Sequence, residues 1–151
     1  MKEAPTPFTA DQIRGGCPEG RTVTTRMIDE AGAVTYWKST FTDCDEGGSV
    51  ILNEQVTESG ESIGGAESFR STWDELRRHA AFPESATTIS RELVSTPLGR
   101  LQCLRYEVEV PGAVRMLWFA LDLPGMPVRT ARASDGEVFV DSEIVADTTV
   151  G

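Results

Sequence analysis

His79 is the only histidine in the chain, and therefore the only side chain whose ordinary charge change falls near neutral pH. An imidazole that acts as a general base needs a substrate within hydrogen-bond reach and usually a partner that orients it. No neighbouring residue identifies such a partner. A position near the end of a helix also accounts for this histidine, because the helix dipole favours partial positive charge there. Catalysis by His79 is therefore an alternative hypothesis only, and we predict no catalytic residue.

Cysteine and histidine lack the spacings of known metal sites. The chain has no Cys-x-x-Cys pair. Cys17, Cys44 and Cys103 supply, with the histidine, only four thiolate or imidazole ligands, and these belong to separate elements. We therefore predict no metal and no cofactor. Cys103 lies in an apolar strand, whereas Cys17 and Cys44 lie near turns and are expected to pair only in an oxidising compartment.

The charge balance excludes several classes of partner. The chain carries 24 acidic and 14 basic residues, a formal net charge of −10, and no cluster of lysine and arginine. A nucleic-acid-binding protein needs a basic face to neutralise phosphates, and so does a protein that binds an anionic membrane. We predict neither partner. No apolar run approaches the roughly 18 residues of a transmembrane helix, so we also expect no transmembrane segment.

The length of 151 residues predicts one domain over 1–151, with residues 1–8 as an extended, proline-rich arm. This arm has no apolar region typical of a secretory signal. The sequence as given therefore favours a cytoplasmic location, and the cell envelope is the alternative if an export leader has been removed.

A two-residue hydrophobic period dominates the chain and predicts strands. The segments are separated by turn residues, including Asp135-Gly136, which suits a type I′ hairpin. Because short connections join antiparallel neighbours, we predict a β-dominated α+β fold. Its antiparallel meander has about eight or nine strands and forms a curved sheet or half-barrel. The strand segments are 21–27, 33–41, 49–57, 63–69, 87–95, 100–110, 114–121, 128–133 and 137–145.

One segment, at about residues 72–81, has helical periodicity. Trp73, Leu76 and Ala80 are spaced to lie on one face, and a capping-box pattern precedes them. We expect this short helix to pack on the concave face of the sheet. Thr9 is also placed to cap a shorter helix over residues 10–14.

A curved sheet with so small a helical cover is expected to leave an apolar cavity. The candidate lining residues are apolar side chains of the strands and of the helix. They are Val50, Leu52, Trp73, Leu76, Tyr106, Val108 and Trp118.

The second half of the chain resembles a known family. The resemblance rests on Thr96-Pro97-Leu98-Gly99, Cys103-Leu104-Arg105-Tyr106, residues 118–128 and Asp135-Gly136-Glu137-Val138. These stretches are similar to the closing hairpins of LolA-like and LppX-like half-barrel carriers. The resemblance implies a curved sheet around a helical plug, a hydrophobic cavity, and lipid or lipoprotein handling in the cell envelope. The lipid-attachment cysteine near the N-terminus is missing here, and no catalytic residue carries over.

Three functions follow as hypotheses. The first is a non-enzymatic binding module that holds a hydrophobic or lipid-like small molecule. The second is a protein-interaction or scaffold domain, self-associating or not, without a ligand. The third is a small enzyme that uses His79. The sequence identifies no ligand, protein partner, oligomeric state or pathway.

Overall fold

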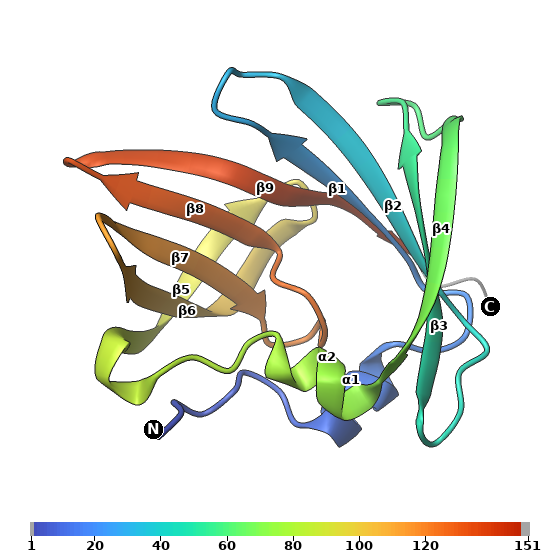
Figure 1. The fold of residues 1–151 in the computed structure, drawn as a ribbon, viewed down its shortest axis with the longest axis horizontal. Coiled ribbons are helices and arrows are strands. Elements are labelled where there is room, and N and C mark those ends of the chain that lie inside the picture. Colours follow the sequence, from blue (N-terminus) through green and yellow to red (C-terminus); the bar gives the residue numbers. More distant parts are fainter. Residues whose placement is uncertain (1, 149–151) are drawn as a thin grey trace.

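A computed structural model describes residues 2–148 as one antiparallel sheet with helices at one end (Figure 1). The helices are α1 (Ala10–Gly16), α2 (Trp73–Arg78) and the short 3-10 turn η1 (Glu84–Ala86). The strands are β1 (Thr22–Ile28), β2 (Val34–Thr42), β3 (Gly48–Val56), β4 (Ser62–Thr72), β5 (Thr87–Thr96), β6 (Gly99–Val110), β7 (Ala113–Ala120), β8 (Arg129–Ser134) and β9 (Glu137–Thr148).

The nine strands confirm the predicted β-dominated, antiparallel and curved fold. Their order across the sheet is β4-β3-β2-β1-β9-β8-β7-β6-β5. Each half of the chain is a meander, and the halves join where β1 pairs with β9. The sheet is open, with β4 and β5 as its two edges. The connection between those edges runs through α2 and η1, and this places the helix where it can cover the concave side.

Buried side chains form two clusters, and β7 contributes to both. Leu117 and Phe119 belong to the first cluster, with the helices, whereas Trp118 and its alternating neighbours belong to the second. Successive side chains of a strand point to opposite faces, so the core of this molecule lies on both sides of β7. The second cluster is covered because β5 curls back toward β8 and β9. There, an Arg129 side chain donates a hydrogen bond to the carbonyl of Ser95 at 2.7 Å.

The structure contains two α-helices, in the two segments where helices were predicted, although the expected fold placed only the second of them on the concave face. The first begins at Thr9, where the Thr9 hydroxyl and the Gln12 side chain each bond the other's backbone N–H in a capping box. The second begins at Thr72, whose hydroxyl accepts from the backbone N–H of Glu75. Both are short, and they pack against each other at the same end of the sheet (Figure 1). Their stability therefore depends on tertiary packing.

The N-terminal arm is bound to the rest of the protein. Backbone hydrogen bonds join Ala4 to Phe82 and Glu84 to Lys2, so the arm pairs with the segment after α2. Phe8 is buried, and its ring meets that of Phe119 edge to face at 6.3 Å. The extended arm expected from the prolines is thus part of the core.

Tyr106 fixes this arm from the sheet side, and its titration can be measured. The buried hydroxyl donates to the Pro5 carbonyl at 2.5 Å, and burial raises the pKa of Tyr106 to about 12. An unfolded tyrosine titrates near 10, so the unfolded chain releases a proton that the folded chain keeps. Stability should therefore be complete below about pH 10 and fall as the pH rises toward 12, by at most ~1.4 kcal/mol per pH unit from this residue.

We expect the Tyr106→Phe variant to lose this alkaline slope, and to lose about 0.5–1.5 kcal/mol at pH 7 with the missing hydrogen bond. Denaturant unfolding between pH 7 and 12 measures both effects, and Tyr36→Phe is the matched control. Equal alkaline slopes for wild type and Tyr106→Phe would contradict the prediction.

Candidate functional site

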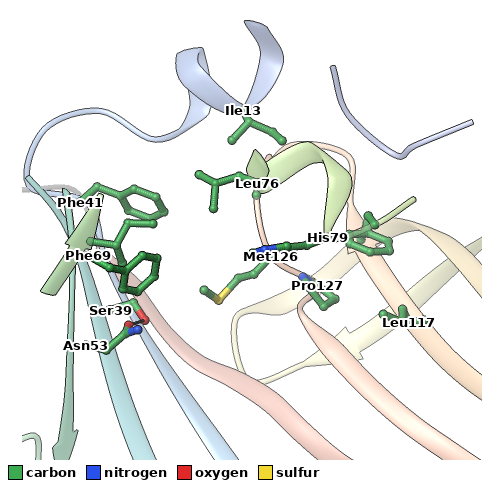
Figure 2. A pocket seen from close by; sticks show the side chains of 14 residues that line it. Ile13, Ser39, Phe41, Asn53, Phe69, Leu76, His79, Leu117, Met126 and Pro127 are labelled. Carbon is green, nitrogen blue, oxygen red and sulfur yellow. Dashed lines mark hydrogen bonds between the residues drawn. The ribbon is translucent and has the colours of Figure 1, made fainter. Parts of the chain in front are cut away.

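An apolar hollow lies between the sheet and the helices, and Figure 2 shows it from close by. Its volume is about 220 Å³. One wall comes from β2, β3 and β4, where Phe41 pairs with Ile51 and Ile51 pairs with Phe69 across the strands. Register places these three side chains on one face, so they form an apolar row across three strands.

The opposite wall comes from β7 and from the loop after it. Leu117 and Phe119 stand two apart in β7 and therefore share the face that meets the pocket. The loop adds Gly125, Met126 and Pro127. In Figure 2 the Met126 side chain extends from this loop toward Phe69 and the β2–β3 wall. An unbranched thioether adapts its shape easily, so Met126 is a deformable part of the lining.

The helices close one end of the pocket. Ile13 is the buried residue of α1, and Leu76 projects from α2 toward it in Figure 2. Ala80 follows α2 and is also buried against the hollow. The cover on this side thus consists of three aliphatic side chains on two short helical segments.

Three polar side chains reach the pocket. Ser39 and Asn53 are paired residues of β2 and β3, and the Ser39 hydroxyl donates to Asn53 Oδ1 at 2.5 Å. His79 lies on the other side of the pocket, away from this pair (Figure 2). His79 is exposed, and so is Phe69 at 45% of its surface, so both border solvent. The lining contains no lysine, arginine, aspartate or glutamate.

We expected seven residues to line a cavity, and the structure places one of them, Leu76, in the lining of the pocket. Trp73, Tyr106 and Val108 belong to the cluster of buried side chains beside it, and they pack behind the lining.

Three further expected residues do not line the pocket, because they alternate with lining residues along their strands and so point to the other face of the sheet. Val50 and Leu52 flank Ile51, which lines the pocket, so they point to the other face of β3. Trp118 alternates with Leu117 and Phe119 in the same way.

Trp118 instead contacts charged residues on the opposite face of the sheet. Its ring lies between the guanidinium groups of Arg105 and Arg129, 5.7 and 5.6 Å from the ring centre. The indole nitrogen donates to Glu92 at 3.2 Å, and Arg129 pairs with Glu143 at 2.7 Å. Cation–π contacts and paired charges account for this tryptophan as a structural residue.

His79 lacks the surroundings of a catalytic base. Within residues 2–148 its ring makes no hydrogen bond and no ion pair, whereas the nearby Asp74 is occupied by Arg77 and Arg78 at 2.8 and 2.7 Å. Hydrogen bonds from these two arginines also lower the pKa of Asp74. No carboxylate therefore orients the imidazole in the way that acid–base catalysis uses.

The cysteines are free thiols in this structure. Burial raises the pKa of Cys17, of Cys44 and of Cys103, so the reactive thiolate form is disfavoured at each. The Cys44 thiol lies 3.7 Å from the Cys17 carbonyl oxygen, and the pairing of these residues in an oxidising compartment stays a prediction. Over the described part of the chain, no three His, Cys, Asp or Glu side chains gather closely enough to hold a metal ion. No helix in that part is long and apolar enough to span a membrane.

No model of a protein family matches the chain, and no curated protein matches it.

Proposed function

We propose that this protein is a non-enzymatic binding module that holds a hydrophobic or lipid-like small molecule in the pocket of Figure 2. The observation that carries the proposal is a hollow of about 220 Å³ with a mostly apolar lining, whose polar side chains are the Ser39–Asn53 pair and His79. Binding sites for small molecules are typically of this kind, concave and apolar with few polar groups that fix orientation.

The size of the pocket limits what it can enclose. An apolar cavity of about 150 Å³ is known to hold benzene, whereas drug-sized ligands occupy roughly 300–1,000 Å³. The pocket here lies between these limits, so it encloses a compact molecule, or one end of a longer one that leaves past Phe69 and His79. The resemblance of the closing strands to LolA-like carriers adds support, since such carriers hold a hydrophobic ligand between a curved sheet and a helical plug.

A neutral fluorescent dye tests the proposal. We expect N-phenyl-1-naphthylamine to bind with a dissociation constant below about 100 µM, equivalent to roughly −5.5 kcal/mol. The Ala80→Leu substitution adds three carbon atoms to the buried side of the pocket and should weaken this binding at least fivefold, because it fills the space. Ala33→Leu makes the same change at an exposed turn and should have no effect.

Circular dichroism and thermal unfolding of both variants establish that they are folded. A dissociation constant above 100 µM for the wild type, or equal affinities in Ala80→Leu and Ala33→Leu, would refute binding in this pocket. A scaffold function would then become the better hypothesis, and the association state measured by native mass spectrometry would be its first test.

A further inference from the structure

The polar pair at the base of the pocket offers an unused hydrogen-bond donor. The Ser39 hydroxyl already donates to Asn53 Oδ1, so the carbonyl end of this amide is occupied. The other end, Asn53 Nδ2, makes no hydrogen bond to any residue from 2 to 148. Asn53 is half-buried among the lining residues, and its Nδ2 keeps accessible surface. A ligand atom that accepts a hydrogen bond would give this donor a partner within a mostly apolar lining.

The charges around this donor select against an anionic ligand. Glu67 lies directly opposite Asn53 on the neighbouring strand β4, and the chain as a whole has a net charge of −10. No arginine or lysine lines the pocket. A carboxylate placed beside Asn53 would therefore lose its water without gaining a counter-ion, and burial of an unpaired charge is costly. An ammonium group, in turn, has no acceptor to offer to the free N–H groups.

From this geometry we infer that the pocket takes a compact, neutral molecule with a ring-sized apolar body and a carbonyl or hydroxyl oxygen. The oxygen accepts a hydrogen bond from Asn53 Nδ2, while the apolar body lies against Phe41, Ile51 and Phe69. This inference rests on the proposed function and adds to it the class of ligand and the residue that orients it.

Four small probes of similar size separate the effects of the apolar ring, a neutral oxygen, a negative charge and a positive charge on binding. They are ethylbenzene, acetophenone, benzoate and benzylamine, in that order. Chemical-shift changes of the protein amides during titration at pH 7 give the affinity of each. In the wild type we expect acetophenone to bind at least tenfold more tightly than benzoate and benzylamine. In Asn53→Leu, which has similar volume but no amide, acetophenone should bind about tenfold more weakly than in the wild type. Ethylbenzene should bind the variant no less tightly, because it makes no hydrogen bond.

Gln55→Leu is the matched control, since it removes an amide from the same strand outside the pocket lining. It should leave all four affinities unchanged. If Asn53→Leu weakens acetophenone and ethylbenzene equally, or weakens neither, the assignment of Asn53 is overturned. Tighter binding of benzoate or benzylamine than of acetophenone overturns the neutral ligand class.

The failure of this inference is distinguishable from the failure of the proposed function. N-phenyl-1-naphthylamine and ethylbenzene could bind while the affinity for acetophenone does not depend on Asn53. The pocket would then be a binding site without the proposed selectivity. If neither the dye nor any probe binds, the proposed function is refuted, and the inference is refuted with it.

Discussion

Replacing Arg21 with methionine should lower the free energy of unfolding by about 3–5 kcal/mol, because it leaves a buried carboxylate without its partner. The side chains of Arg21 and Asp147 are only 4% and 8% exposed. They form a bidentate ion pair, in which two guanidinium nitrogens donate to the two carboxylate oxygens at 2.7 and 3.1 Å. Removal of one partner from such a pair costs far more than the pair itself contributes, since the desolvation of the remaining charge is no longer offset.

Arg21 also joins the elements that shape the pocket. Its Nη1 donates to the carbonyl oxygens of Gly16, at the end of α1, and of Pro124, in the loop that carries Met126. A Cβ added at Gly16 would come within 2.8 Å of the Pro124 ring, so α1 and this loop are already in close contact. We therefore expect Arg21→Met to weaken dye binding together with stability.

Two further variants complete this experiment, which denaturant unfolding measures. Arg70→Met breaks an ion pair with Asp45 that has similar distances but is about half exposed, and it should cost no more than about 1 kcal/mol. The double variant Arg21→Met/Asp147→Leu removes both charges and should recover much of the loss. Equal costs for Arg21→Met and Arg70→Met would show that burial of the first pair does not matter.

The strands could be read from the sequence because their faces and turns are distinct. All nine expected segments are strands in the structure, and Asp135 and Gly136 have the positive φ angles, 52° and 80°, of the expected turn. The pairing of β1 with β9 was not predictable in this way. Those strands have no connecting turn, and hydrophobic periodicity does not identify a partner more than one hundred residues away.

The pocket was only partly predictable, for a reason that lies in β3 and β7. Val50, Ile51 and Leu52 are all apolar, and so are Leu117, Trp118 and Phe119, because both faces of these strands are covered or half-covered. A period of two cannot choose between faces in a fully apolar run. Asn53 and Ser39 were missed for a different reason: a single polar residue in a strand carries no signal of what it faces until the register is known.

Replacing Trp73 with alanine should also lower the free energy of unfolding by about 3–5 kcal/mol, the usual cost of deleting a large buried aromatic side chain. Trp73 is 4% exposed in the cluster beneath the pocket, and its indole nitrogen donates to the Asp45 carbonyl at 2.8 Å. The substitution leaves a cavity and an unpaired backbone oxygen in the turn between β2 and β3. This helix has six residues, too few for stability without packing, and so it should detach from the sheet.

The expected change in melting temperature is about 6–20 °C, since 1 kcal/mol corresponds to roughly 2–4 °C in a domain of this size. Trp37→Ala is the matched control, because Trp37 is 36% exposed and its indole nitrogen donates a hydrogen bond only to the Thr35 hydroxyl within β2. It should cost less than about 1 kcal/mol. Loss of α2 removes Leu76 and Ala80 from the pocket, so Trp73→Ala should weaken dye binding even below its melting temperature. A Trp73→Ala protein that melts within one or two degrees of the wild type would contradict the role of α2 as the cover of the concave face.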